Sequence, residues 1–520
     1  MTPRRRLGVV VGALGASAAV SLATPFGGLS AVGHYALATA VFAAVLWVTE
    51  ALPLPVTALC VPVLLTTYGV FPTLGRALDG FADPVVFLLL TGFVLAAALS
   101  KHGIDRRIAY RIVLRVGTSP RRLVLAVMVA TAGLSMVISN TATTAMMVPV
   151  AVGVTAATTD DSPGAGPGAV GPEAGDPPEG PTNVETAALL GTAYAASIGG
   201  VGTVIGTPPN AIVVAQLSAT LGYEISFLDW LVVGLPVVVV TLPAAWYLLA
   251  VRLYPPREAS VGGAREHARA ALDALGPLDP VGRRVAAIVA AVAALWLLGG
   301  ADEAIAPLLS PRVRTTLFGG PGASVFGVGH EGLLDFVVVG LAAIPALFLA
   351  GGVEWDDAAG IDWGTLVLLG GGLSLADALA STDAVAWLAD AALSPLVDVP
   401  VVLLVFAVVL GTVVASELAS NTAMAAILAP LLIGAGPRYA DALGTTGEGA
   451  SVLLAVTGAV AASFGFALPV ATPPNAIAYG TGRVDRARML RAGSVLDVVA
   501  AVLVTATLLA LFAVVWPVVG

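Results

Sequence analysis

Long apolar stretches, separated by short polar loops, dominate the hydropathy pattern of this chain. A membrane-crossing helix needs about 20 mostly apolar residues. Eleven stretches fit, and they cover residues 8–24, 34–51, 54–70, 84–100, 184–222, 228–251, 283–300, 332–350, 362–380, 448–482 and 493–516. Two further apolar stretches, 121–157 and 398–436, are too long for one crossing and have polar residues in the middle. The pattern predicts an all-α polytopic membrane protein with 11 transmembrane helices and two re-entrant hairpins.

Composition supports a membrane protein. Of 520 residues, 58% are hydrophobic and only 11% are charged, whereas soluble proteins average about 25% charged residues. This excludes a soluble enzyme, and the net charge of −9 argues against a nucleic-acid partner. The single cysteine, Cys60, excludes disulfides and cysteine-based metal sites. The partner that composition predicts is the lipid bilayer.

The basic residues predict the orientation of the chain. With the N-terminus inside, 20 of the 24 Lys and Arg residues fall on the inner side, as the positive-inside rule expects for a cell-membrane protein. Treating either long stretch as a plain crossing inverts everything after it and destroys this asymmetry. The C-terminus is then outside, and the acidic Pro/Gly-rich segment 158–182 is expected to be a flexible inside loop. Residues 4–24 also resemble a signal peptide, but a first transmembrane helix is the preferred interpretation.

Two polar motifs occur twice, in the same order. Residues 139–149 read SNTATTAMMVP and residues 420–430 read SNTAMAAILAP, while TPPNAI occurs at both 207–212 and 472–477. Five crossings separate equivalent points of the two copies, so the second copy is inverted relative to the first. Inverted repeats with broken helices are typical of secondary transporters, which bind their cargo where the halves meet.

The motifs suit an anion together with a small cation. A turn at membrane depth frees backbone groups, which is tolerated where they line a cavity or bind a ligand. Consecutive prolines break a helix and leave carbonyls uncovered before the break, and these oxygens, with Ser and Asn side chains, suit Na⁺. The next helix starts with free N–H groups and a positive dipole end, which suit a carboxylate or another oxyanion. Neither motif contains Arg or Lys, so the cation must complete the anion site.

These motifs, together with TEALPLPVTAL at 49–59, resemble the divalent anion/sodium symporter (DASS) family of dicarboxylate, citrate or sulfate carriers. The resemblance implies a homodimer in which each chain has a scaffold domain and a transport domain that moves like an elevator. It divides the chain into residues 1–120 (scaffold helices 1–4 with an inner-surface helix), 121–252 (first hairpin and transport helices of repeat 1), 253–397 (inside loop, scaffold helices 7–9 and an outer-surface helix) and 398–520 (second hairpin and transport helices of repeat 2).

The resemblance also implies site residues. The first Na⁺ site falls on Ser135, Ser139, Asn140 and Gly206, and the second falls on Ser416, Ala419, Asn421 and Ala471. The substrate carboxylates are expected to meet Asn140, Thr141 and Thr207 on one side and Asn421, Thr422 and Thr472 on the other, with Pro208 and Pro473 shaping the pocket. Ala478 stands where a larger residue can contact substrate, which leaves substrate choice open.

Ionisable residues in or near the spans have several possible roles. Glu417 precedes the second SNT motif, where the first repeat has Met136. A proton carrier, a residue that tunes the second cation site, and a hydrogen-bonded structural carboxylate all fit it. Asp83 and Asp362 precede helices and are expected to cap them, and Asp377 is expected to pin a helix break.

The sequence therefore predicts a secondary transporter that couples Na⁺ entry to symport of a small dianion, with C4-dicarboxylates such as succinate, malate or fumarate preferred. Na⁺ is the co-transported ion, and no organic cofactor is expected. Sulfate or another inorganic oxyanion, H⁺ coupling, and exchange transport are the alternatives within this class. A cation/proton antiporter is a different class, and only Glu417 could supply the titratable group that it needs. An enzyme is not expected, because no nucleophile–base pair or metal cluster lies in the spans.

Overall fold

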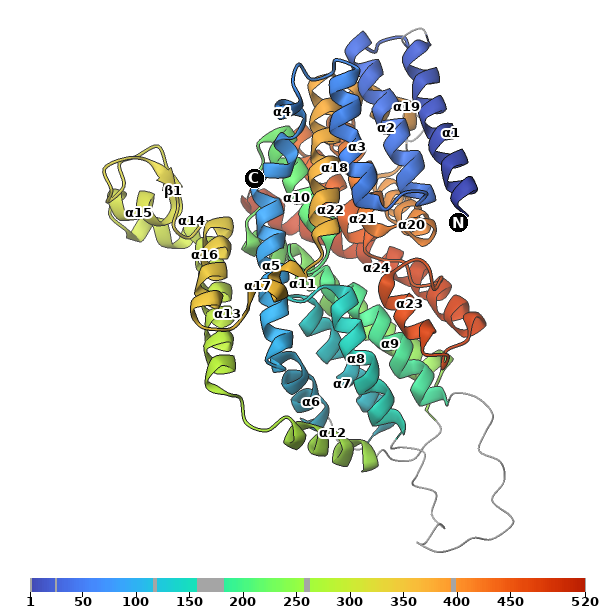
Figure 1. Ribbon diagram of the computed structural model, residues 1–520, viewed down its shortest axis with the longest axis vertical. Helices are drawn as coiled ribbons and strands as arrows, with labels where there is room; N and C mark the ends of the chain where they lie inside the picture. Colours follow the sequence, from blue (N-terminus) through green and yellow to red (C-terminus); the bar gives the residue numbers. More distant parts are fainter. Residues whose placement is uncertain are drawn as a thin grey trace, which may run out of the picture.

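The computed structural model describes residues 2–23, 26–115, 119–156, 182–256, 262–393 and 399–519, and these are mostly helical (Figure 1). Within these ranges, nine helical segments are long and apolar enough to cross a membrane. They are Pro3–Leu22 (α1), Ala31–Thr49 (α2), Pro84–Lys101 (α5), Phe227–Leu253 (α11, Phe227–Tyr247, with η2, Leu248–Leu253), Pro280–Gly299 (α13), Trp363–Ser381 (α18), Val401–Leu418 (α20), Asn421–Leu443 (α21) and Arg486–Val514 of α24 (Arg486–Val519). Three shorter apolar helices are Leu54–Thr67 (α3), Phe336–Leu349 (α16) and Gly447–Ala462 (α22). The number of crossings stays a prediction.

The remaining elements are short or amphipathic, or they lie around the motifs. They are α4 (Leu74–Ala77), η1 (Asp79–Ala82), α6 (Ile104–Arg115), α7 (Pro120–Ser135), α8 (Asn140–Ala156), α9 (Asn183–Gly200), α10 (Pro208–Leu221), α12 (Gly262–Ala274), α14 (Asp302–Ile305), η3 (Ala306–Leu308), α15 (Pro311–Phe318), β1 (Gly319–Gly320), β2 (His330–Glu331), α17 (Trp355–Ala359), α19 (Ala384–Leu393) and α23 (Pro473–Gly480). The segment 158–181, most of the acidic loop expected inside, lies outside the described residues.

Each of the four apolar stretches that carry motifs consists of two helices. The two stretches predicted to be hairpins become α7 with α8 and α20 with α21, and an SNT motif lies at each turn. The spans 184–222 and 448–482 break into α9 with α10 and α22 with α23. Pro208 and Pro473 are each the first residue of the new helix, where proline is favoured because the first N–H of a helix has no intrahelical partner.

The two halves of the chain interlock through their broken helices. Helix α10, which follows the first TPPN motif, packs against α21 and α22 of the second half. Helix α23, which follows the second TPPN motif, packs against α8 and α9 of the first half. The Tyr194 ring of α9 lies 5.0 Å from the ring of Phe466 in the second break, as measured between centroids. Each TPPN helix therefore lies on the other half's motif region.

Predictions about individual carboxylates met different outcomes. Asp83 Oδ1 accepts a hydrogen bond from the Val85 amide at 2.8 Å, and Asp362 Oδ1 accepts one from the Thr365 amide at 3.1 Å, so both are N-caps as expected. Asp377 lies within the continuous helix α18, so it pins no break in its own helix. Its carboxylate lies 2.7 Å from the guanidinium of Arg76, an ion pair between distant segments that local sequence does not reveal.

Hydrogen bonds and packing connect short surface helices to the ends of the long helices. Helix α12 packs on α6 and α8. The buried Arg107 of α6 donates from Nη2 to the carbonyl of Leu275 at 2.8 Å, just beyond the end of α12. At the end of α5, Lys101 Nζ donates to the Asp357 carboxylate at 2.6 Å, and this hydrogen bond holds the pKa of Asp357 below its ordinary value.

A small lobe between α13 and α16 departs from the expected all-α class. It contains α14, η3, α15 and the antiparallel pair β1–β2, and it projects from the body of the molecule (Figure 1). Gly319 and Gly320 have φ of +82° and +121°, which residues with a Cβ rarely adopt. The glycines therefore permit this pair of strands within a helical chain.

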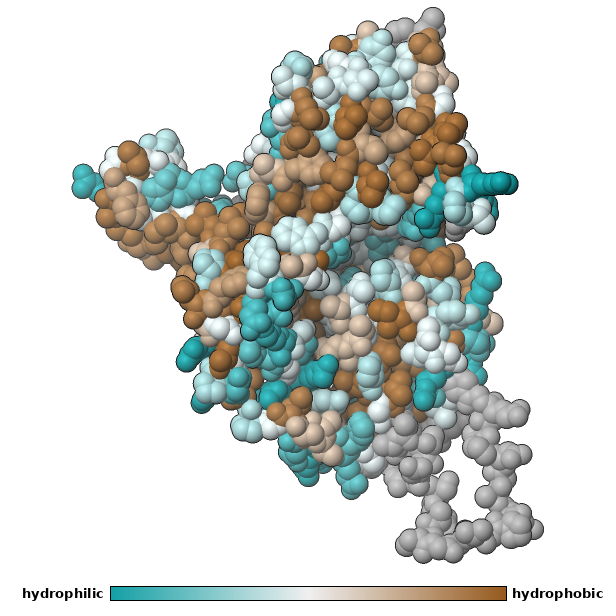
Figure 2. Space-filling view, in the orientation of Figure 1, coloured by the Kyte–Doolittle hydropathy of each residue, from teal (hydrophilic) through white to brown (hydrophobic). Residues whose placement is uncertain are grey.

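Hydrophobic and hydrophilic side chains gather in different regions of the surface in Figure 2. Hydrophobic side chains cover the region where Figure 1 places α1–α3, and also the outer side of α13 and α16. Hydrophilic side chains gather at the end of the molecule near α12. Exposed apolar side chains on such helices are those expected to face lipid tails.

Candidate functional site

The first SNT hairpin brings three oxygen atoms together. Ser135 ends α7 and is fully buried; its Oγ lies 2.6 Å from Asn140 Oδ1 and 2.8 Å from the carbonyl oxygen of Ala196 in α9. A hydroxyl has one proton, so it can donate to only one of these two acceptors at a time. A cluster with more oxygens than protons is the environment that a hard cation prefers.

The first helix break closes over this hairpin. Asn140 Nδ2 lies 3.5 Å from Thr207 Oγ1, and the Thr203 hydroxyl donates to the carbonyl of Met136 at the hairpin turn. Gly206 allows the backbone to fold tightly here, because a Cβ at this position would lie 2.4 Å from the Gly200 carbonyl oxygen. Contacts therefore link Ser135, Asn140 and Thr207, and Gly206 lies in the same tightly folded break.

The second hairpin repeats part of this arrangement. The buried Ser416 hydroxyl donates to the carbonyl of Ala462 in α22 at 3.1 Å, as Ser135 contacts Ala196 in the first half. Asn421 Oδ1 is buried and has no hydrogen-bond partner among the described residues. A Cβ on Gly465 would lie 3.4 Å from the Cβ of Ala471 and 3.7 Å from the Ser416 carbonyl oxygen, so this break also approaches its hairpin closely.

The Glu417 carboxylate binds two backbone amides of the second break. Its Oε1 accepts from the Ala467 amide at 2.7 Å and its Oε2 accepts from the Leu468 amide at 2.8 Å. Asp497 of α24 accepts from the neighbouring Phe466 amide at 3.1 Å. Among the three proposed roles, these bonds support a structural carboxylate. The sequence interpretation missed Asp497, although a carboxylate inside the apolar span 493–516 was an available signal.

The remaining predicted residues differ in exposure. Ser139 Oγ accepts from the Ala142 amide at 3.4 Å, and Thr472 Oγ1 accepts from the Asn475 amide at 3.2 Å, so both act locally as caps. Thr141 is exposed and Thr422 is half-buried. Asn140, Asn421 and Pro208 are half-buried and Pro473 is exposed, whereas Ala419 and Ala471 are buried.

Helix ends supply the positive potential at the motifs. Helices α8, α10, α21 and α23 begin at Asn140, Pro208, Asn421 and Pro473. Free N–H groups and the dipole at a helix N-terminus attract anions. No Arg or Lys belongs to the hairpin turns or the breaks. The arrangement can thus hold cations on oxygen atoms and an anion on helix N-termini, without a basic side chain.

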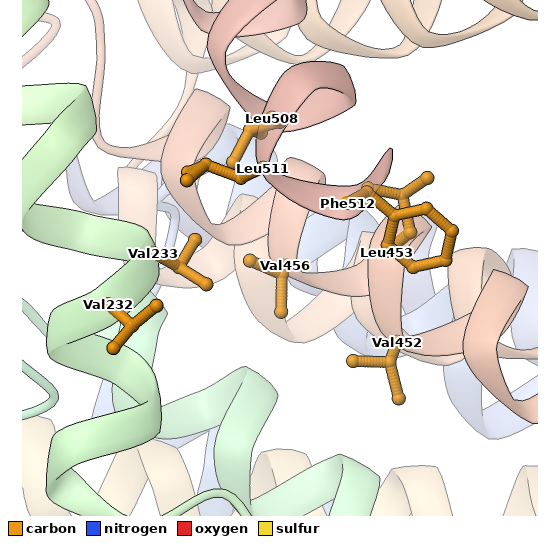
Figure 3. Close-up of a pocket in the computed structure, with 8 residues that line it drawn as sticks. All are labelled: Val232, Val233, Val452, Leu453, Val456, Leu508, Leu511 and Phe512. Atoms are coloured by element: carbon orange, nitrogen blue, oxygen red, sulfur yellow. The ribbon is translucent and has the colours of Figure 1, made fainter. Parts of the chain in front are cut away.

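Two cavities in the described part of the molecule do not contain these motifs. One has a volume of about 70 Å³ and lies between α11, α22 and α24, with a lining of only apolar residues (Figure 3): Val232, Val233, Val452, Leu453, Val456, Leu508, Leu511 and Phe512. The other, of about 960 Å³, lies beside the projecting lobe. Its charged lining residues include Asp83, Glu224, Asp229 and Glu331, but no Lys or Arg. Neither lining suits a dianion.

Solved structures share the fold at low sequence identity. The YdaH transporter of Alcanivorax borkumensis has a TM-score of 0.52 and 15% identity, with coverage of 85% of this chain and 87% of that chain. Neisseria gonorrhoeae MtrF has a TM-score of 0.53 and 12% identity, with coverage of 99% and 95%. These likenesses support a polytopic transporter fold and say nothing of the cargo.

Sequence relatives identify the family. A Haemophilus influenzae protein described as an uncharacterized transporter is 34% identical over 470 residues, which are 90% of this chain and 89% of that protein. The sodium-dependent dicarboxylate transporter SdcS of Staphylococcus aureus (strain USA300) is 30% identical over 481 residues, covering 91% and 84%. The model of the sodium:sulfate symporter transmembrane region matches residues 13–520. The chain therefore belongs to the sodium:sulfate symporter family, the divalent anion/sodium symporters that its motifs resemble.

Proposed function

We propose that this protein is a Na⁺-coupled symporter of small divalent anions, with C4-dicarboxylates such as succinate, malate and fumarate as cargo. The observation that carries the proposal is the cluster of three oxygen atoms, Ser135 Oγ, Asn140 Oδ1 and the Ala196 carbonyl oxygen. The single hydroxyl proton of Ser135 can satisfy only one of the other two oxygens at a time. Family membership supports Na⁺ as the cation. The dicarboxylate relatives support the cargo, since they match more than four-fifths of both chains.

The proposed cation sites follow the two hairpins. The first uses Ser135, Ser139, Asn140 and Gly206, and the second uses Ser416, Ala419, Asn421 and Ala471. The two alanines contribute only their backbone carbonyls, and Asn421 Oδ1, which has no hydrogen-bond partner in the described part of the chain, is available as a ligand. Hard oxygen ligands of this kind suit a small cation.

The proposed anion site lies between the cations and the helix N-termini. Its side-chain donors are Asn140, Thr141 and Thr207 from the first half and Asn421, Thr422 and Thr472 from the second, with Pro208 and Pro473 shaping the walls. Because no Arg or Lys belongs to the motifs, bound Na⁺ supplies the charge that the helix dipoles leave uncompensated. Coupling follows, since the anion binds weakly until the cations are in place.

The proposed architecture has 11 crossings, two re-entrant hairpins and two inverted repeats, with the N-terminus inside and the C-terminus outside. The reciprocal packing of α10 on α21 and of α23 on α8 supports the repeats, and the excess of basic residues on one side supports the orientation. An elevator movement of the motif-bearing helices against a dimeric scaffold is the transport mechanism that we propose from the family resemblance.

Uptake in proteoliposomes tests the proposal. Radiolabelled succinate should accumulate with an inward Na⁺ gradient and not with an equal K⁺ gradient, and an inward H⁺ gradient alone should not replace Na⁺. Asn140→Ala and Asn421→Ala should each abolish uptake while the protein remains folded. Uptake that ignores Na⁺ removal rejects the coupling, and near-normal uptake by either variant rejects the site assignment.

Sulfate is the second candidate cargo, because the matching family model is described by sodium:sulfate symport. Both anions carry two negative charges, and helix N-termini bind either chemistry. Competition separates them. Sulfate uptake that excess succinate does not inhibit would assign the protein to inorganic oxyanions.

A further inference from the structure

The asparagine that ends each TPPN motif makes the same contacts in both halves. Asn210 Nδ2 donates to the carbonyls of Gly200 at 3.0 Å and Thr203 at 2.7 Å. Asn475 Nδ2 donates to the carbonyls of Gly465 at 2.9 Å and Leu468 at 3.0 Å. Both asparagines are fully buried. In each half the acceptors lie 10 and 7 residues before the asparagine, so the side chain spans the helix break.

The geometry identifies which end of each amide faces the break. Two carbonyl oxygens lie at hydrogen-bond distance from one end, so that end must be the NH₂ group, because an oxygen there would be repelled. The other end, Oδ1, is buried without a hydrogen-bond partner in the described residues in both halves. Each side chain therefore directs its NH₂ group at carbonyls where the helix breaks, and Asn210 Nδ2 also lies 3.4 Å from the Val201 carbonyl oxygen.

The backbone that Asn210 and Asn475 hold, which we call the clamped segments, borders the proposed cation sites. A Cβ on Gly200 would lie 2.2 Å from Asn140 Oδ1, and a Cβ on Gly206 would lie 2.4 Å from the Gly200 oxygen that Asn210 holds. In the second half, a Cβ on Gly465, whose oxygen Asn475 holds, would lie 3.7 Å from the Ser416 carbonyl oxygen. A small shift of either clamped segment thus moves ligand atoms of one cation site.

We propose that Asn210 and Asn475 are positioning residues, each of which holds one helix break in the conformation that its Na⁺ site requires. The inference rests on the proposed Na⁺ coupling. The Thr203 and Leu468 oxygens also accept from the Gly206 and Ala471 amides, at 3.3 and 3.2 Å. A carbonyl oxygen has two lone pairs, so the Gly200 and Gly465 oxygens can accept from an asparagine and still face the site. Loss of one clamp loosens one Na⁺ site and leaves the other site intact. Na⁺ binding then becomes weaker and less cooperative. Substrate binding changes less, once Na⁺ is saturating.

Isosteric variants test the clamp. Asn210→Asp and Asn475→Asp keep the size of the side chain and lose both donors. Asn210→Ser and Asn475→Ser add no charge and are too short to reach both carbonyls, so they provide a second pair if the Asp variants do not fold. Asn183→Asp is the matched control, because Asn183 Nδ2 donates to the Pro255 carbonyl at 3.0 Å, away from both breaks.

Two measurements separate positioning from general stability. The first is succinate uptake as a function of Na⁺ concentration, where the half-saturating Na⁺ concentration should rise at least about fivefold and the Hill coefficient should fall. The KM for succinate at saturating Na⁺ should change by less than about threefold, which is under 1 kcal/mol. The second is the rise of Tm with Na⁺ in detergent without substrate, which reports cation binding by mass action and should shift to higher Na⁺ concentration.

The outcomes are distinguishable. If wild type shows the Na⁺ response and the clamp variants respond at the same Na⁺ concentration as Asn183→Asp, the positioning inference is wrong and the proposed function stands. If the succinate KM rises as much as the Na⁺ requirement, the asparagines act on the anion site instead. If wild type itself shows no Na⁺ response in either measurement, the proposed coupling fails first.

Discussion

Removing the Ser135 hydroxyl is the most direct perturbation of the first proposed cation site. This group is fully buried, and Ser135→Ala leaves Asn140 Oδ1 and the Ala196 carbonyl without it. An unsatisfied buried polar group costs about 1–3 kcal/mol. If that cost falls on the cation-bound state, Na⁺ affinity decreases by about 5- to 150-fold. Ser416→Ala removes a single longer contact, 3.1 Å to Ala462, so its effect should lie toward the low end of that range.

The assay is Na⁺-dependent uptake of radiolabelled succinate by each variant, reconstituted at equal protein content. Thr131→Ala is the control on the same helix, since the buried Thr131 hydroxyl donates to its own helix at the Val127 carbonyl, at 2.7 Å. The control should keep the wild-type Na⁺ requirement. A Ser135→Ala protein that transports with the Na⁺ requirement of Thr131→Ala would refute the assignment of this hydroxyl as a cation ligand.

Three further changes test other features. Gly200→Ala should abolish uptake, because its Cβ would lie 2.2 Å from Asn140 Oδ1, whereas Gly133→Ala, with nothing within 4 Å, should transport normally; uptake by both variants, each checked for folding, contradicts the tight approach. Glu417→Gln should lower the free energy of unfolding by about 1–3 kcal/mol. The glutamine side chain has one acceptor oxygen, whereas the two carboxylate oxygens of Glu417 accept from two backbone N–H groups at 2.7 and 2.8 Å. An unchanged Tm in detergent contradicts this. Arg107→Lys should expose the end of α12 to protease, because one ammonium cannot reach all the carbonyls that the guanidinium holds; an unchanged cleavage pattern contradicts this.

Local chemistry explains what the sequence predicted well. Pro208 and Pro473 each start a helix because proline fits the first position and breaks the preceding turn. The boundaries of the hairpins and breaks follow from such signals, and so do the caps Asp83 and Asp362.

Contacts between distant segments explain what the sequence did not predict. Glu417 binds amides 50 and 51 residues away, and no periodicity or motif encodes that distance. Asp377 meets Arg76 across the fold for the same reason. The TPPN motif was recognised in the sequence, but the contacts of Asn210 were not predicted. The direction of its side chain depends on the backbone conformation of the break.

The reciprocal packing of the two halves has a consequence for biosynthesis. When the first half leaves the ribosome, α10 is complete, but α21 and α22, the surfaces on which it packs, have not been made. The first helix break therefore cannot reach its final surroundings until nearly the whole chain is in the membrane. A chain truncated before residue 398 should insert and remain immature, a target for membrane proteases, rather than form half of a transporter.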